Sequence, residues 1–165
     1  MKTRRIDNYG KINRDKILSF RWDKKNYKGF EGDTLASALL ANNIGIVGRS
    51  FKYHRPRGIF SSGVEESGAL VTIGSKDRRD PNVRATTQEL YNGLEASGQN
   101  AFPNVNFDLA AINNYLGRFF AAGFYYKTFM GIPPFEWGRG TAIWMFLEKL
   151  IRKEPGMGSA SELPD

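Results

Sequence analysis

The first strong pattern along the chain is an alternation of apolar and polar residues over positions 16–22. Such an alternation predicts a half-buried strand, and its apolar face is formed by Leu18, Phe20 and Trp22. Polar residues suited to a turn follow at 23–26, and residues 27–30 can return as a second strand. The pattern therefore predicts a β-hairpin near the start of the chain.

A short helix is predicted after the hairpin. Asp33 can accept hydrogen bonds from the free amides of a first helical turn. Leu35 and Leu39 recur at a spacing of four residues, which places them on one apolar face. Asn42 and Asn43 form a suitable stop, because asparagine tolerates the left-handed backbone conformation. We expect both leucines to be core residues.

Three further segments have strand character. Residues 44–47 and 69–73 are short apolar runs, and residues 83–90 favour a strand at their beginning. A polar, Gly-marked loop is expected at 74–81. A hairpin, a helix and strands that return after a long loop are typical of a β-grasp, so the predicted fold class is α+β.

The C-terminal part of the chain has a different pattern. Residues 107–118 and 141–153 have helical periodicity. Six aromatic residues lie between them: Phe119, Phe120, Phe124, Tyr125, Tyr126 and Phe129. Two helices cannot bury so many aromatics, so we expect a further surface to cover them. We predict a β-grasp domain over 1–97, a helical, aromatic-rich connecting segment over 98–154, and a Gly/Ser/Pro linker over 155–165.

Charge is distributed unevenly. The net charge is +7, and residues 1–60 contain 14 Lys or Arg against 5 Asp or Glu, whereas the remainder contains 10 against 12. A basic N-terminal part predicts an acidic partner, such as nucleic acid, a phosphate-bearing cofactor or an acidic protein surface. The polar N-terminus lacks a signal-peptide pattern, and no apolar run approaches the ~18 residues of a spanning helix. We therefore expect a soluble, cytoplasmic protein without membrane contact.

The absence of cysteine limits the chemistry. The 165 residues contain no Cys, which excludes disulfides, thiolate catalysis and cysteine-ligated metal sites. The single histidine, His54, lies among cations and is expected to be a surface or hydrogen-bonded residue. Glu65 and Glu66 are adjacent, and we expect solvated or salt-bridged side chains there. No dinucleotide fingerprint is present. We predict no catalytic, cofactor-binding or metal-binding residue.

The most unusual stretch is a basic loop over residues 48–58. Its candidate interface residues interleave cations with an aromatic ring: Arg49, Lys52, Tyr53, His54, Arg55 and Arg57. Arginine offers a planar fork of donors suited to carboxylates and phosphates. Three interpretations are open: a solvated structural loop, a surface that docks on protein or cofactor, and a nucleic-acid site. Docking is favoured, and nucleic acid is unlikely because no recognition helix or continuous basic face accompanies the loop.

Three segments resemble the N-terminal region of the alpha subunits of heterotetrameric sarcosine oxidases. They are GDTLASALLANNIGIVGRSFKYHRPRGIFSSGVEESGALVTIG, DPNVRATTQELYNGLEASGQN and AAGFYYKTFM. The resemblance covers roughly residues 10–155 and implies a ferredoxin-like β-grasp. Relatives in other amine-oxidising complexes carry a two-iron two-sulfur cluster on a Cys-x₄-Cys-x₂-Cys run. Placing that run before Leu70 puts Ser61, Glu66 and Ala69 at the ligand positions, so the resemblance implies a domain that has lost its cluster.

The resemblance also implies a function for the parent complex. Such complexes demethylate sarcosine to glycine, produce hydrogen peroxide and form methylene-tetrahydrofolate, using NAD, FAD, FMN and tetrahydrofolate. We expect none of these cofactors on this chain, which resembles an N-terminal fragment of a longer subunit. The predicted function is a non-catalytic scaffold, inactive alone, whose partners are the rest of the alpha subunit and the other subunits. The alternative is a stand-alone basic module that binds nucleic acid or another polyanion.

Overall fold

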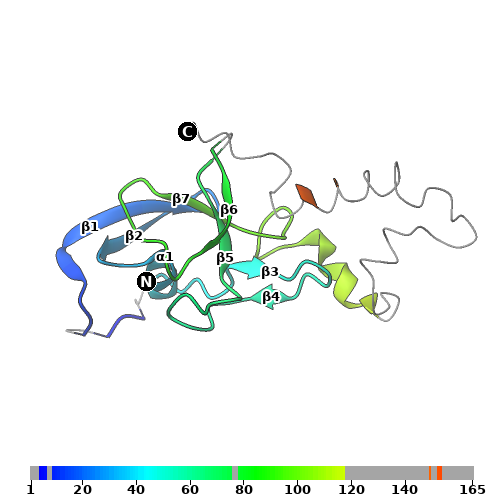
Figure 1. The fold of residues 1–165 in the computed structure, drawn as a ribbon, viewed down its shortest axis with the longest axis horizontal. Helices are drawn as coiled ribbons and strands as arrows, with labels where there is room; N and C mark the ends of the chain where they lie inside the picture. Colours follow the sequence, from blue (N-terminus) through cyan, green and yellow to red (C-terminus); the bar gives the residue numbers. More distant parts are fainter. Residues whose placement is uncertain (1–3, 7–8, 76–77, 118–148, 150–151, 154–165) are drawn as a thin grey trace, which may run out of the picture.

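A mixed five-stranded sheet forms the centre of the computed structural model, which describes residues 4–6, 9–75, 78–117, 149 and 152–153 (Figure 1). The strand order is β2-β1-β7-β5-β6. The strands are β1 (Asn13–Trp22), β2 (Lys25–Glu31), β5 (Leu70–Ile73), β6 (Asp80–Arg84) and β7 (Glu95–Gly98).

The predicted hairpin is confirmed, with longer strands than expected. β1 and β2 pair antiparallel, and Phe20 lies opposite Tyr27 in the register. Asp23 and Lys24 both have positive φ angles, of 45° and 69°. A two-residue turn of this kind matches the right-handed twist of the paired strands. The apolar face of β1 is buried, with Phe20 only 1% exposed.

The sheet is completed by a parallel pairing between β1 and β7. β7 also pairs antiparallel with β5, so it is the middle strand of the sheet. Ser97, where the sequence suggested a domain edge, is paired with Thr72 inside this strand. The sheet therefore continues at least to Gly98, and a boundary at 97 would cut its central strand. The glycine- and asparagine-rich composition that suggested the edge begins inside the sheet.

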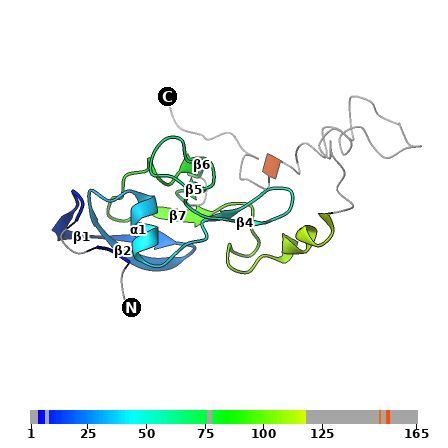
Figure 2. The same cartoon turned by 90° about the horizontal axis from the view of Figure 1, so that it is seen from below.

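Helix α1 (Leu35–Ala41) lies across the hairpin, as Figure 2 shows. The expected core positions are confirmed, since Leu35 and Leu39 are both 0% exposed. The cap differs from the expectation: Thr34, and not Asp33, is the N-cap, and it forms a reciprocal capping box with Ser37. The Asp33 carboxylate is buried and binds groups other than the amides of the first helical turn.

Asp33 joins three segments of the chain. Its carboxylate accepts from the Phe30 amide (2.8 Å) and the Ser37 hydroxyl (2.7 Å), and it pairs with both terminal nitrogens of Arg5. The Arg5 guanidinium also lies over the Phe30 ring at 5.1 Å. The basic lead-in is therefore fixed to the helix start by a bidentate ion pair.

The apolar run at 44–47 is not a strand. The helix ends in a Schellman motif, in which the amides of Asn43 and Ile44 donate to Leu40 and Leu39. Asn43 adopts the left-handed conformation with φ 62°, so the expected stop is confirmed. The strand begins later, as β3 (Gly48–Arg49), and pairs with β4 (Pro56–Arg57).

The edge strand β6 lies earlier in the sequence than the strand predicted over 83–90. β6 begins at Asp80, inside the predicted loop, because it forms a hairpin with the short β5. Its pairing ends at Arg84, where the amides of Thr87 and Gln88 donate back to the Arg84 carbonyl. The remainder of the 83–90 segment is therefore a turn that packs beside α1, and the Ala36 amide donates to Ala85.

A short 3₁₀ helix, η1 (Leu109–Asn114), stands where a longer α-helix was predicted over 107–118. Three residues per turn align Leu109, Ile112 and the capping Tyr115 along one side, and their exposed fractions are 59%, 60% and 84%. The mostly helical, aromatic-rich extension is thus not supported by the described residues. The aromatic run 119–131, the linker 155–165 and nearly all of the predicted 141–153 helix lie outside them.

Leu39 offers a direct test of the core. Leu39→Ala is expected to lower the free energy of unfolding by about 2–5 kcal/mol, because the side chain is fully buried. Leu40→Ala is the matched control, because Leu40 is next to Leu39 on the same helix but is 38% exposed. This substitution should cost well under half as much free energy of unfolding. Chemical denaturation of both variants measures the difference. Equal losses would mean that α1 does not bury Leu39 against the sheet.

Candidate functional site

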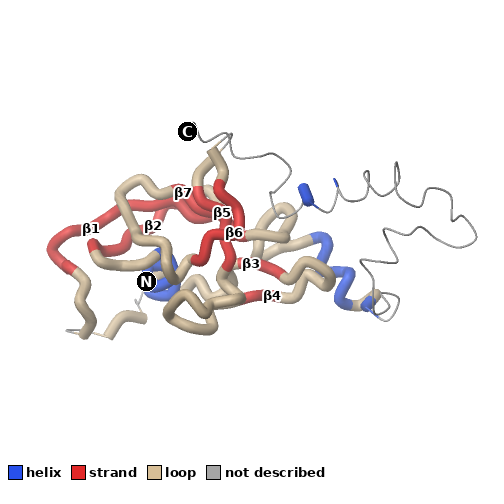
Figure 3. The backbone as a smooth tube through the Cα atoms, viewed as in Figure 1, coloured by secondary structure: helices blue, strands red, loops and turns tan. Residues whose placement is uncertain are grey.

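The basic loop is a small hairpin, residues 48–57, which we call the basic hairpin (Figure 3). β3 and β4 pair at Gly48 with Arg57 and at Arg49 with Pro56. The Arg49 amide donates to the Gln99 carbonyl (3.0 Å), which joins the hairpin to the segment that follows β7. The hairpin is therefore fixed to the sheet domain through backbone contacts.

Two of the predicted interface residues are turned inward. His54 is 3% exposed, and its Nδ1 lies 2.8 Å from the Oδ2 atom of Asp108. Arg49 donates to the carbonyls of Val105 (2.9 Å) and His54 (2.8 Å), and its Nε lies 3.6 Å from Asp108. These two residues connect the hairpin to the segment before η1 and do not present a docking surface.

Asp108 is the centre of this contact. Its side chain is fully buried, and its Oδ1 atom accepts from the amides of Phe102 (3.0 Å) and Ala110 (3.2 Å). A buried charge requires such partners, because desolvation is otherwise too costly. His54 was expected to be a surface or a hydrogen-bonded residue, and the second alternative is confirmed. Its partner is 54 residues away, so no local signal could have identified it.

The other candidate residues form the outer side of the hairpin. Arg55 and Arg57 are exposed, whereas Lys52 and Tyr53 are half-buried. The Lys52 amine and the Arg55 guanidinium lie over the Tyr53 ring at 4.9 and 4.8 Å. Arg55 Nε also donates to the Asn114 side chain (2.9 Å). The aromatic ring and the η1 contact hold the cationic side chains in a defined arrangement.

A second feature adjoins the hairpin: residues 58–69, which we call the cradle loop. Glu66 is 2% exposed. Its Oε2 atom accepts from the amides of Phe60 (2.6 Å) and Ser61 (2.7 Å), and its Oε1 atom accepts from Gly68 and from Ala69 (3.1 Å). Four backbone N–H groups from the two ends of the loop thus converge on one carboxylate.

This geometry determines the charge state of Glu66. Burial by itself would raise the pKa of the carboxyl, but the hydrogen bonds from Ser61, Gly68, Phe60 and Ala69 outweigh it and lower the pKa from 4.5 to about 2. Glu66 is therefore ionised at neutral pH although it is buried. The expectation of a solvated or salt-bridged residue is wrong for Glu66, because its charge is stabilised by backbone dipoles.

The three positions that the resemblance aligns with cluster ligands come together in the structure. The Glu66 carboxylate bridges the amides of Ser61 and Ala69, the other two positions. Gly68 is needed beside it, because a Cβ there would lie 2.8 Å from the Gly58 carbonyl oxygen and 3.2 Å from Glu66 Oε1. Sequence reasoning placed these positions on one loop but missed the role of the carboxylate. The placement of a glutamate at a metal-ligand position was the available signal.

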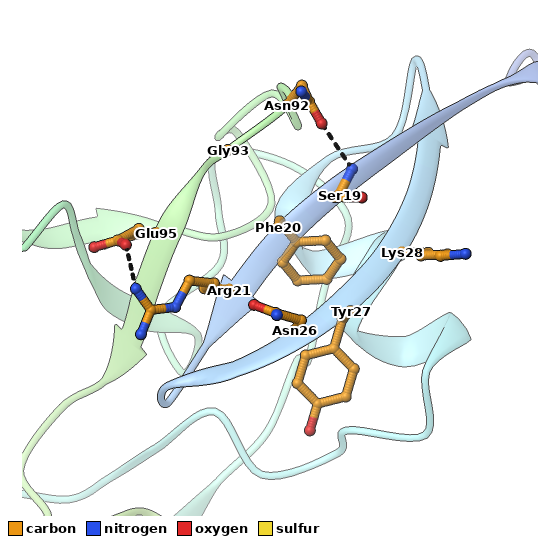
Figure 4. A pocket seen from close by; sticks show the side chains of 9 residues that line it. All are labelled: Ser19, Phe20, Arg21, Asn26, Tyr27, Lys28, Asn92, Gly93 and Glu95. Atoms are coloured by element: carbon orange, nitrogen blue, oxygen red, sulfur yellow. Dashed lines mark hydrogen bonds and ion pairs between the residues drawn. The ribbon is translucent and has the colours of Figure 1, made fainter.

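Two concave surfaces of the domain could receive a ligand. One lies between the basic hairpin and the cradle loop, where Arg49, Arg57 and Gly68 contribute to its lining. The other lies on the sheet over β1 and β2 (Figure 4), and its Arg21 and Glu95 already pair at 2.6 Å. The first surface brings the two features of the site together, and we take it as the candidate functional site.

Within the described part of the chain, no cluster of three or more His, Cys, Asp or Glu residues could hold a metal ion. The same residues include no helix long and apolar enough to span a membrane. At the candidate site the exposed Arg57 side chain offers a fork of donors that can recognise an anionic group.

Comparison with known proteins identifies the class. The family model described as "2Fe-2S iron-sulfur cluster binding domain" matches residues 15–101, and the chain belongs to this family. The expected ferredoxin-like domain is thereby confirmed. The matched range ends just beyond β7, which agrees with a domain that includes the whole sheet.

The relatives confirm the resemblance to sarcosine oxidase alpha subunits. "Sarcosine oxidase subunit alpha" of Rhizobium meliloti (strain 1021) is 51% identical over 162 residues, which cover 98% of this chain and 16% of the relative. The protein of the same name from Corynebacterium sp. (strain U-96) is 46% identical over 90 residues, covering 53% and 9%. The chain thus spans about a sixth of the length of the first relative.

One solved structure is also similar. The L-proline dehydrogenase from P. horikoshii is 25% identical, with a TM-score of 0.44, over 53% of this chain and 16% of that protein.

The residues present do not fit the cluster that the family name implies. A two-iron two-sulfur cluster is held by cysteine thiolates, or by cysteine and histidine, and the chain contains no cysteine. Its one histidine is committed to Asp108. The backbone amides of the cradle loop already donate to Glu66. We therefore derive no electron-transfer step for this chain.

Asp108→Asn tests the buried contact behind the basic hairpin. We expect a loss of about 3–5 kcal/mol in the free energy of unfolding, because Arg49 is left buried beside a neutral partner. Glu95→Gln is the control, since it removes a carboxylate whose ion pair with Arg21 is exposed and should cost about 0–1 kcal/mol. Denaturant unfolding of the two variants gives the comparison. A loss for Asp108→Asn no greater than the control's would contradict the structural role of Asp108.

The lowered pKa of Glu66 predicts a pH dependence. The folded-state pKa lies below the ordinary value, so the stabilisation is complete above about pH 4.5 and is lost as the pH falls towards 2. A shift from 4.5 to about 2 corresponds to about 3 kcal/mol. The stability difference between the wild type and Glu66→Gln should therefore narrow by about this amount between neutral and acidic pH. Unfolding curves at stepped pH values measure this difference in the free energy of unfolding. A difference that stays constant with pH would contradict the prediction.

Proposed function

We propose that this chain is a non-catalytic scaffold part of a sarcosine oxidase alpha subunit. The observation that carries the proposal is the cradle loop, because the Glu66 carboxylate there accepts from the amides of Ser61 and Ala69, the positions that the resemblance aligns with cluster ligands. The 51% identity to a sarcosine oxidase alpha subunit supplies the biological setting. In that setting, the oxidation of sarcosine and its flavin, NAD and folate cofactors belong to other parts of the complex.

The partner surface is the outer side of the basic hairpin. Arg55 and Arg57 are exposed, and the hairpin backbone is fixed by its own pairing and by the contact with Gln99. A rigid loop loses little conformational entropy on docking. The proposed partner is an acidic surface of the remaining alpha subunit or of a neighbouring subunit.

A polyanion-binding module remains the competing function. The +7 net charge and the stacking of Lys52 and Arg55 on Tyr53 favour it. However, Arg49 and His54 are turned inward, so the number of outward cations is smaller than the sequence suggests. A site that neutralises few phosphates has a shallow salt dependence and weak affinity.

The double variant Arg55→Ala/Arg57→Ala tests the proposed docking surface. It should be made in the full-length natural gene product, and Lys25→Ala/Lys28→Ala on β2 is the control because it removes two exposed cations elsewhere. Losing an interface arginine whose partner stays unpaired costs about 2–5 kcal/mol, so affinity for the flavin-bearing subunits should fall at least about thirtyfold. Co-purification and quantitative binding measure the loss.

DNA binding is measured in parallel. The proposal requires negligible DNA affinity in the parent protein. Intact assembly together with DNA binding that only the arginine variant loses would favour the polyanion module. Equal effects of the arginine and lysine variants on assembly would show that the hairpin is not the docking surface.

A further inference from the structure

We propose that the cradle loop is an anion-binding site whose ligand is the chain's own Glu66 carboxylate. The negative charge that a cluster would bring to this loop is supplied here by a side chain. The ligand class that fits is a planar anion with two oxygens, such as a carboxylate. This inference concerns the loop itself and holds whether or not the proposed docking function is correct.

The arrangement of donors supports a specific anion site. Two donors, the amides of Phe60 and Ser61, precede the glutamate and share one oxygen. Two more, from Gly68 and Ala69, follow it and share the other oxygen. The carboxylate thus spans the gap between the two ends of the loop, with both oxygens used. Successive backbone amides that point inward form an anion-binding concavity of the type found at phosphate and iron–sulfur sites.

The negative charge of Glu66 is stabilised by backbone amides and not by a cationic side chain. Among the described residues no ion pair to Glu66 is present. The nearby Arg84 donates to the backbone carbonyl of Glu66 (3.3 Å) and not to its carboxylate. The loop is also attached to the sheet domain independently, because the Thr86 hydroxyl donates to the Gly63 carbonyl (2.7 Å). Removal of the side chain therefore leaves a loop that is still attached at other points.

An emptied cradle should accept a small anion from solution. Truncation of Glu66 to alanine removes the carboxylate but leaves four N–H donors directed at the space that it filled. Buried donors without acceptors are unfavourable, so an external acceptor of the right shape is stabilising. Formate reproduces the two oxygens of the carboxylate in the smallest volume. Chloride has the charge without the two oxygens, which makes it the appropriate salt control.

The experiment compares Glu66→Ala with the wild type and with Glu65→Ala in the full 165-residue chain. Glu65 is the matched control because it is adjacent, acidic and exposed, and its carboxylate accepts from the Gly63 amide of the same loop (3.2 Å). Denaturation midpoints are measured in sodium formate and in sodium chloride at equal ionic strength. Formate should stabilise Glu66→Ala saturably and leave the other two proteins at their chloride values. At ten times the dissociation constant, the unfolding equilibrium constant should fall about tenfold.

A second variant separates charge from volume. Glu66→Gln fills the cradle but places an amide donor against backbone donors, so it should be destabilised at neutral pH and should not respond to formate. If Glu66→Ala does not fold in chloride, its refolding yield is measured across the formate series instead. Backbone amide shifts of Phe60, Ser61, Gly68 and Ala69 should report formate binding in Glu66→Ala.

Several outcomes would overturn the inference. One is a Glu66→Gln protein as stable as the wild type at neutral pH. Another is a formate effect of equal size in the wild type and Glu66→Ala. A third is no recovery of Glu66→Ala, in midpoint or in refolding yield, at any formate concentration.

Discussion

Four backbone amides that donate to the buried carboxylate of Glu66 hold together the long connection between β4 and β5. The loop contains too little regular structure to satisfy its own N–H groups, and buried donors must find acceptors. Because the carboxylate joins the two ends of the loop, it also brings Gly58 against Gly68. The basic hairpin is thereby held beside the start of β5, in addition to its own backbone contact with Gln99.

A buried carboxylate also joins separate segments at two other places in the domain. Asp33 joins the N-terminal lead-in, the end of β2 and the start of α1, and its side chain is fully buried. Asp108 joins the basic hairpin to the segment before η1. In each case a buried carboxylate accepts from at least one backbone amide in a turn or loop. The two aspartates also pair with a basic side chain, Arg5 or His54, whereas Glu66 relies on amides alone.

Local patterns predicted the elements whose stability is local. The alternation in β1, the leucine spacing in α1 and the asparagines at its end all identified correct structure, because strand faces and helix caps depend on neighbouring residues. The failures have a common physical origin. His54 meets Asp108 over 54 residues, and Ser97 lies in a strand whose parallel neighbour is β1. Residue spacing in the sequence carries no information about such long-range contacts.

At the candidate site, too, local features could be predicted from the sequence and long-range contacts could not. The sequence identified the basic loop, because charge density can be read directly, and the family resemblance placed Ser61, Glu66 and Ala69 on one loop. It could not separate the inward Arg49 from the outward Arg55 and Arg57, because that depends on the two-residue strands of the hairpin and on the position of Asp108. An arginine that makes internal contacts, as Arg49 does, stabilises the hairpin but adds little to the positive charge that the hairpin surface presents to a partner.

The buried amides of a ferredoxin-like loop that holds no cluster need another acceptor. A buried amide without an acceptor costs about 1–3 kcal/mol, and four such amides would consume much of the ~5–15 kcal/mol that typically stabilises a domain. Serine and alanine at the outer positions, Ser61 and Ala69, provide no replacement for the missing charge, and the longer glutamate at the middle position reaches the amides of both. One anionic side chain of sufficient length therefore satisfies the buried amides at both ends of this loop.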